Sequence, residues 1–122
     1  MRGWYTEAMR ALLALGILTA CSDDPEVRII APLPDTTVVA SVELRMEGHN
    51  LSTTTETKIY VDLQQFTGEL VDNTLPDECD DCAFVIGFAG ADITNGPHTV
   101  GVYLFEGEKQ LATDAIPLVF AR

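Results

Sequence analysis

The residues best suited to chemistry stand in one stretch, DNTLPDECDDC, at positions 72–82. Its two cysteines, Cys79 and Cys82, have the C-x-x-C spacing found in local disulfides, in thiol redox pairs and in half of a zinc site. The leader described below indicates export, and exported compartments are generally oxidising. We therefore expect a local disulfide that pins the loop before the next strand. In the chain-entropy model, a disulfide that closes so small a ring adds only about 2 kcal/mol to the free energy of unfolding.

Two other uses of this cysteine pair are weighed against the disulfide. A thioredoxin-like redox pair needs a thiolate stabilised at a helix N-terminus, whereas Glu78, Asp80 and Asp81 surround this pair with negative charge that disfavours a thiolate. A zinc site needs two further ligands. The only histidines, His49 and His98, are distant in sequence and stand at no recognised spacing.

The same stretch holds five carboxylates within ten residues, a set that could gather Ca²⁺, which takes six to eight oxygen ligands. Their spacing matches no EF-hand, and a solvated acidic loop is the alternative. We predict no resident metal or cofactor, and we keep these acids as weak Ca²⁺ candidates: Asp72, Asp77, Glu78, Asp80 and Asp81.

His98 follows Pro97 and could act as a general base. No serine or cysteine nucleophile and no orienting acid lies at a recognisable spacing from it. We expect its imidazole to satisfy backbone groups at a corner of the fold, and we predict that the protein is not an enzyme. Tyr60, Tyr103 and Phe105 are predicted on solvent-facing sides of strands, where they could form a sugar- or protein-binding strip or ordinary cross-strand pairs.

The third cysteine, Cys21, ends an apolar segment, ALLALGILTA at 11–20, that is preceded by Arg2 and Arg10. At about 1.5 Å per helical residue the segment is too short to cross a ~30 Å hydrocarbon core. A basic start, an apolar stretch and small residues before a cut are the features of a secretory signal.

The residues LTAC at 18–21 resemble the lipobox of bacterial lipoproteins. The resemblance implies that the Cys21 thiol is diacylated, that the chain is cut after Ala20 and that the new amino terminus is acylated. Several acyl chains give stable membrane anchoring where one is marginal. An ordinary cleaved signal with a structural Cys21, or a short buried helix, is the alternative. By the same resemblance, Ser22 favours the outer membrane over the inner membrane of the cell envelope.

Composition limits the partners. The chain has 122 residues and a net charge of −12. Such an acidic surface repels phosphate backbones and argues against nucleic acid. The predicted organisation is a signal peptide at 1–20, the lipidated cysteine with a short tether at 21–25, and one domain at 26–121.

Within this domain the apolar residues alternate with polar ones, which is typical of strands with one buried and one wet face. Six strong strands and a weaker candidate at Phe66–Val71 predict an all-β, two-sheet antiparallel sandwich. Leu63 is expected on a buried face. Pro117 is expected to place the last strand at a sheet edge, because proline cannot donate to a ladder. The strong strands lie in these runs: EVRIIAP, SVELRMEG, KIYVDL, CAFVIGFAG, HTVGVYLFEG and AIPLVFA.

Two phrases, IIAPLPDTTVV at 29–39 and ADITNGPHTVGVYLF at 91–105, resemble the first-strand and late-hairpin signatures of bacterial immunoglobulin-like domains. The resemblance implies an immunoglobulin-like sandwich of about seven strands. The chain departs from antibody-type domains in two ways. Its only tryptophan, Trp4, lies in the leader, so no tryptophan packs in the core, and its cysteines stand too close together to bridge opposite sheets.

The resulting hypothesis is an envelope lipoprotein acting as a non-enzymatic interaction or structural module, bound to the membrane by its lipid and to an unknown envelope protein or glycan. The alternatives are a Ca²⁺-dependent adhesion or carbohydrate-binding module that uses the 72–81 acids, and a redox protein that uses Cys79 and Cys82. A fold of this kind hosts many functions and licenses none by itself.

Overall fold

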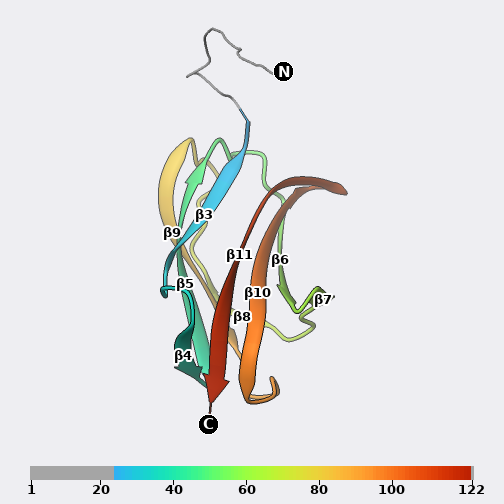
Figure 1. The fold of residues 1–122 in the computed structure, drawn as a ribbon. Helices are drawn as coiled ribbons and strands as arrows, with labels where there is room; N and C mark the ends of the chain where they lie inside the picture. Colours follow the sequence, from blue (N-terminus) through green and yellow to red (C-terminus); the bar gives the residue numbers. More distant parts are fainter. Residues whose placement is uncertain (1–23, 122) are drawn as a thin grey trace, which may run out of the picture.

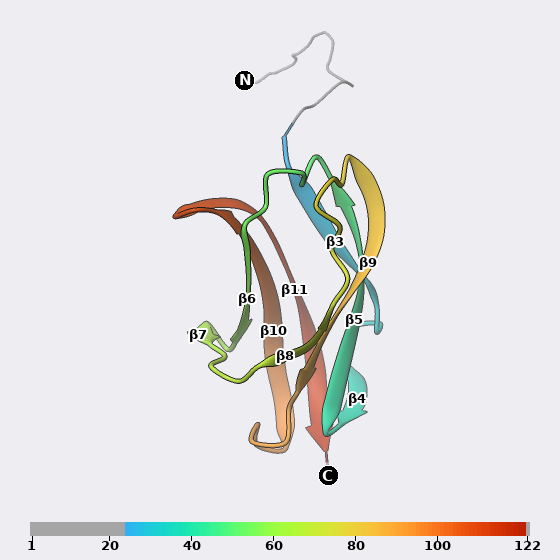
Figure 2. The same cartoon turned by 180° about the vertical axis from the view of Figure 1, so that it is seen from behind.

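A computed structural model describes residues 24–121 of the chain. The predicted signal peptide, Cys21 and most of the tether lie outside the described residues. The described residues form two β-sheets packed face to face (Figures 1 and 2). Within them, no helix has the length and hydropathy needed to cross a membrane.

The spatial order of the strands is that of an immunoglobulin-like sandwich. One sheet has the order β3–β5–β9–β8, which corresponds to the A–B–E–D sheet, and the other, β4–β11–β10–β6–β7, contains the G–F–C order. The predicted fold class is therefore confirmed. The four-stranded sheet consists of β3 (Glu26–Ala31), β5 (Ser41–His49), β9 (Asp81–Ala89) and β8 (Leu70–Asn73). The five-stranded sheet consists of β4 (Thr36–Val39), β11 (Lys109–Ala121), β10 (Gly96–Glu106), β6 (Glu56–Val61) and β7 (Gln64–Gln65).

Alternating side chains from both sheets fill the space between them. Because successive strand residues point to opposite faces, β5 and β9 contribute every second residue, and β10 and β11 do the same from the other side. The buried side chains that the alternation predicted are Val42, Leu44, Met46, Ile59, Phe84, Ile86, Phe88, Val100, Val102, Leu104, Ile116, Leu118 and Phe120.

The last strand differs from its prediction. β11 is not an edge strand, because β4 pairs with it in parallel along Thr36–Val39. Pro117 is tolerated inside the sheet because its missing N–H does not face β10. Its carbonyl accepts a hydrogen bond from the N–H of Asp35, just before β4, at 2.8 Å. Since the nitrogen and carbonyl of one strand residue point to the same side, the missing N–H also faces the start of β4, and the ladder to β10 is intact.

Leu63 also differs from its prediction, because its side chain is 84% exposed. The strand ends at Val61, and Asp62 and Leu63 form a two-residue turn into β7 with φ values of 51° and 70°. Two successive positive φ values are those of a type I′ hairpin turn, which matches the twist of the flanking strands. The turn interrupts the alternation and rotates Leu63 out of the core.

The weak strand candidate at Phe66–Val71 is only partly a strand. Its last two residues belong to β8, which pairs with β9, whereas the short β7 that pairs with β6 lies just before the predicted range. The residues between β7 and β8 carry the chain from one sheet to the other, with Phe66 packed against Phe88 of the core at 5.1 Å between ring centroids. The predicted range is therefore mostly a crossing between the sheets.

We predict that Leu44→Ala lowers the free energy of unfolding by about 2–5 kcal/mol, because it removes a fully buried side chain and leaves a cavity. The matched control Leu63→Ala should change it by less than about 0.5 kcal/mol, since that side chain is exposed. Urea titration of both variants measures the difference. Equal losses would contradict the placement of Leu63.

Candidate binding surface

The outer face of the five-stranded sheet carries a row of aromatic side chains. On β10, Val102 and Leu104 are fully buried, which turns the residues between and beyond them, Gly101, Tyr103 and Phe105, to the outer face. Tyr103 and Phe105 are half-buried. The predicted solvent-facing strip is thus present, at the centre of the sheet rather than at its rim.

Gly101 lets the ring of Tyr103 lie down against the sheet. A Cβ atom at Gly101 would come within 3.1 Å of Tyr103 Cε1, so the ring occupies the space that a side chain would need. Gly101 is opposite Tyr60 on β6, and the rings of Tyr60 and Tyr103 lie 4.6 Å apart between centroids at an interplanar angle of 54°. We call Gly101, Tyr103 and Tyr60 the tyrosine shelf.

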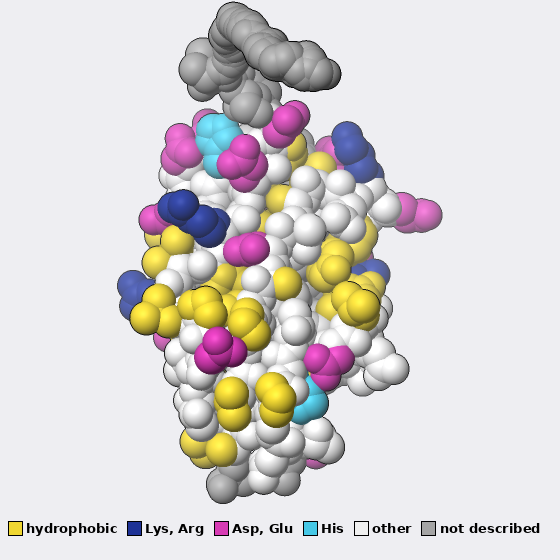
Figure 3. Space-filling model, viewed as in Figure 1, with side chains coloured by type: hydrophobic (Ala, Val, Ile, Leu, Met, Phe, Trp, Pro, Cys, Tyr) yellow, Lys and Arg dark blue, Asp and Glu magenta, His cyan; other side chains and the backbone are white. Residues whose placement is uncertain are grey.

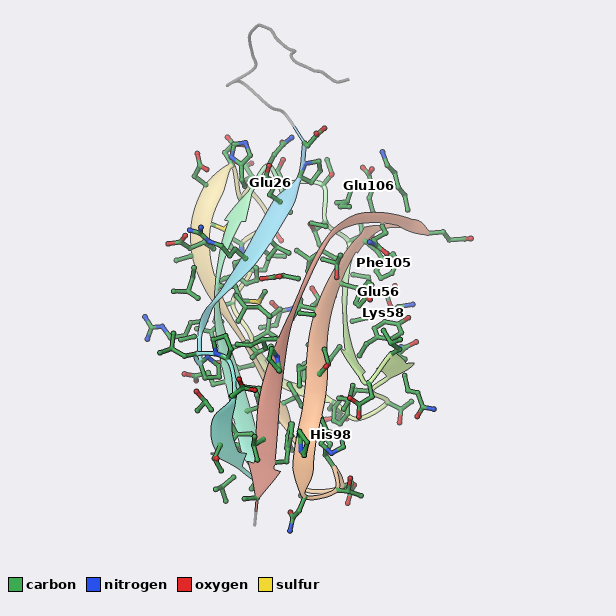
Figure 4. The ribbon with its side chains drawn as sticks, viewed as in Figure 1. Glu26, Glu56, Lys58, His98, Phe105 and Glu106 are labelled. Carbon is green, nitrogen blue, oxygen red and sulfur yellow. A yellow bond between two sulfur atoms is a disulfide. The ribbon has the colours of Figure 1, made fainter. Side chains whose placement is uncertain are left out.

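Charged side chains border the shelf toward the β10–β11 turn. The Lys58 ammonium lies 5.1 Å from the centroid of the Phe105 ring, a cation–π contact. Its nitrogen is 4.0 Å from a carboxylate oxygen of Glu56, which is opposite Phe105 in the register. Figure 4 shows Glu56, Lys58 and Phe105 side by side along β6 and β10. In the view of Figure 1, which looks onto the side of the sandwich where β3 and β11 lie, acidic side chains are scattered over the surface and hydrophobic ones gather over its middle (Figure 3).

His98 lies near the start of β10 and joins three segments. Its Nδ1 is 2.5 Å from a carboxylate oxygen of Asp62 in the β6–β7 turn, and its Nε2 is 2.8 Å from the carbonyl oxygen of Thr94. Its ring meets Phe120 edge-on at 5.5 Å between centroids. Asp62 is held in turn, because its other carboxylate oxygen accepts the N–H of Thr99 at 2.8 Å.

The partners of the ring favour its protonated form. The Asp62 carboxylate at Nδ1 and the Thr94 carbonyl at Nε2 are both acceptors, to which a protonated ring can donate from both nitrogens. The hydrogen bond to Asp62 is the main cause that raises the pKa of His98, with burial opposing it. The hydrogen bonds from Thr99 and then His98 lower the pKa of Asp62.

The Thr94 hydroxyl lies 3.1 Å from Nε2 of His98, so hydroxyl, imidazole and carboxylate form a chain that resembles a hydrolase triad. The Asp62 carboxylate and the Thr94 carbonyl favour the protonated ring, which cannot take a proton from the hydroxyl, so the arrangement favours a structural corner. The backbone partner expected for His98 is present. The sequence did not predict Asp62 as the acid beside His98, because the two residues come close only through the pairing of β6 with β10.

Beside this corner runs an open groove of about 550 Å³ between the 62–69 segment and the loop after β9. Phe66 and Ile93 give it apolar walls, and Glu69, Asp92 and the His98–Asp62 pair line it with charge. The groove holds more acid than base, in keeping with the surface as a whole.

The two cysteines form the expected disulfide, with Cα atoms 5.4 Å apart. Cys79 is fully buried within the core, beneath Gly48. The carbonyls of Cys79 and Asp80 accept hydrogen bonds from the N–H groups of Leu51 and Asn50, each at 2.7 Å. The bridge thus pins the β8–β9 loop to the start of β9, as expected, and these hydrogen bonds join that loop to the β5–β6 loop at one end of the core. A redox pair needs an accessible sulfur, so this burial favours a structural bridge.

The five acids of the Ca²⁺ hypothesis are spread over several elements. Asp72 lies on β8 opposite Gly87, and Asp81 begins β9, where its carboxylate contacts Nδ1 of His49 at 2.8 Å. Among residues 24–121 no three His, Cys, Asp or Glu side chains gather as metal ligands would. Because Cys79 and Cys82 are bonded to each other, neither sulfur is a free thiolate that could ligate zinc.

No known protein-family model matches the chain, and no curated protein matches it. Among solved structures it is similar to an endo-β-1,4-mannanase from Thermotoga petrophila, with 16% identity and a TM-score of 0.57 over 81% of this chain and 20% of that chain. It is also similar to fibronectin(III)-like modules of Clostridium thermocellum CbhA (10% identity, TM-score 0.49, 88% of this chain, 50% of that chain). A third similarity is to titin Ig tandem domains (9% identity, TM-score 0.42, 89% of this chain, 53% of that chain).

These similarities concern the fold. The chain spans about a fifth of the length of the mannanase chain that it matches. At 16% identity the likeness indicates a shared β-sandwich and carries no information on substrate.

We predict that reducing the Cys79–Cys82 bridge lowers the free energy of unfolding by about 2 kcal/mol through lost ring closure. Cys79→Ala should cost about 1 kcal/mol more than Cys82→Ala, because the fully buried sulfur of Cys79 leaves a cavity and the partly exposed one of Cys82 does not. Urea titration of the two variants compares them. Equal losses would show that Cys79 contributes only ring closure.

We predict that His98→Gln lowers the melting temperature more at pH 5 than at pH 9. Because the pKa of His98 is raised, its contribution to the free energy of unfolding is fully present below the ordinary histidine pKa of 6.5. That contribution is lost as the pH rises through the raised pKa. The contribution of Asp62, whose pKa is lowered, is lost only as the pH falls below the ordinary value of 3.8 and through the lowered one.

The matched test is a double-mutant cycle with Asp62→Asn, followed by thermal melts across this pH range. Asparagine tolerates the positive φ of residue 62, so this variant removes the charge and leaves the turn. The coupling free energy between positions 62 and 98 should become smaller as the pH rises. A coupling independent of pH would contradict the ion pair.

Proposed function

We propose that this protein is a lipid-anchored, non-enzymatic interaction module of a bacterial cell envelope. The observation that carries the proposal is the outer face of the five-stranded sheet, where the tyrosine shelf and Phe105 point away from the core. The core lies between the sheets, and the three half-buried aromatic rings on the outer face keep part of their surface open to a partner.

The non-enzymatic part of the proposal is supported by the His98 corner. Within residues 24–121 the imidazole of His98 lies between the Asp62 carboxylate and the Thr94 carbonyl, two acceptors that raise its pKa and favour the protonated ring. A protonated ring cannot act as a base, so this arrangement supports a structural role. The buried Cys79 likewise supports a structural disulfide over redox exchange.

The anchored part rests on the LTAC residues at 18–21. β3 begins at one end of the sandwich and β11 ends at the other (Figure 1). A lipid on Cys21 would attach the domain by the end where β3 begins. The outer sheet face runs along the side of the sandwich, so it stays open to a partner beside the membrane. Ser22 directs this proposal to the outer membrane.

We predict that Cys21→Ser abolishes lipid attachment. The parent protein should enter the detergent phase on phase separation and carry added acyl mass in intact-mass spectrometry, because a thiol is needed for the thioether. The variant should stay in the aqueous phase with no acyl mass. The control is Cys82→Ser, which leaves Cys21 in place and should behave as the parent. A Cys21→Ser protein with full acyl mass would refute the anchor.

A further inference from the structure

We infer that the tyrosine shelf binds a neutral glycan chain, with a pyranose ring stacked on the exposed side of Tyr103. This inference rests on the proposed function and names its partner class. Three independent observations carry it: the ring orientation fixed by Gly101, the polar side chains in the rows beside the shelf, and the local charge balance.

The first observation is that Gly101 opens the space into which Tyr103 lies down. A Cβ atom at Gly101 would come within 3.1 Å of Tyr103 Cε1, so the ring lies against Gly101, and the half-buried side chain keeps part of its surface open to solvent. The tilted contact with Tyr60 holds it there. A pyranose presents axial C–H groups on one side, and these carry the partial positive charge that the negative face of an aromatic ring attracts.

The second observation is the set of hydrogen-bonding groups around the ring. Directly paired residues share a face of the sheet. Tyr103 is flanked by Lys58 on β6 and by Thr113 on β11, and Tyr60 is flanked by Gln65 on β7. Ammonium, hydroxyl and amide groups match sugar hydroxyls, which both donate and accept.

The third observation separates a neutral glycan from other partners. Lys58 and Glu56 neutralise one another within 4.0 Å beside the shelf, whereas the whole chain carries −12. An acidic polymer would be repelled by the surrounding surface, and a basic protein would be drawn to the acids elsewhere. The large exposed hydrophobic side chains, which a protein interface would use, lie off the shelf: Ile30, Leu33, Val39, Leu63 and Val71.

The size of the surface points to a chain rather than a single sugar. Gly101 to Phe105 spans four steps of β10, or about 14 Å at the rise of an antiparallel strand. That length accommodates about three pyranose units. Thr113 and Gln65 each border a surface pocket, but neither pocket is lined by Tyr60, Tyr103 or Phe105, so a flat, extended ligand fits the shelf better than one that needs enclosure.

The experiment uses the full-length protein, purified in a sugar-free detergent, in native electrophoresis through gels that contain a soluble neutral polysaccharide: glucomannan, hydroxyethylcellulose or dextran. We expect at least one polymer to retard the protein. Tyr103→Ala should weaken that association at least tenfold. Gly101→Val should do the same, because its side chain displaces the ring. Tyr103→Phe keeps the stacking face and should retain binding.

The matched control is Leu63→Ala, which removes an exposed side chain off the shelf and should leave the retardation unchanged. Far-UV circular dichroism and the melting temperature of each variant separate lost binding from lost folding. The inference is overturned if no polymer retards the protein, or if Tyr103→Ala binds as well as the parent.

Failure of this inference is distinguishable from failure of the proposed function. A photo-crosslinker at position 103 that captures one envelope protein, with no polysaccharide bound, would keep the interaction module and refute the glycan. A Cys21→Ser protein that keeps its full acyl mass, or a parent protein that carries none, would refute the lipid anchor on Cys21 and leave glycan binding untouched.

Discussion

The alternation of side chains along β10 is the constraint on which the rest of the structure depends. Val100, Val102 and Leu104 are fully buried, at the centre of the core. A strand that sends these residues inward must send Gly101, Tyr103 and Phe105 outward. Slipping the register by one residue would exchange the two sets. The core and the aromatic surface are therefore two faces of one strand, and neither can move without the other.

Two local clamps complete the sandwich at its loops. The Cys79–Cys82 bridge, together with the hydrogen bonds from Asn50 and Leu51, joins the loops at one end of the core. The His98–Asp62 pair joins the β6–β7 turn to the start of β10. Loop segments have few buried apolar contacts, so polar and covalent links carry more of their order than they do in the sheets. The His98–Asp62 pair thereby holds the β6–β7 edge of the five-stranded sheet, which carries the tyrosine shelf.

The surface combines strong net charge with a locally neutral strip. The chain carries −12, which favours solubility and disfavours polyanions. Around the shelf, a cation–π contact between Lys58 and Phe105 and the neighbouring Glu56 balance the charge. The surface as a whole thus repels polyanions, whereas the strip around the shelf is locally neutral and does not repel an uncharged partner. The separation depends on a single lysine placed opposite Tyr103 in the register.

Local pattern alone determined the sandwich and its core, because a period of two along β5, β9, β10 and β11 leaves one way to bury the apolar residues. It also indicated the disulfide, whose partners are three residues apart. Only the tertiary structure decided that β11 is internal and that Asp62 meets His98. Only the structure showed that Tyr103 lies over Gly101. Pairing partners, turn conformation and ring orientation arise from contacts between residues far apart in the chain, and a local pattern does not contain them.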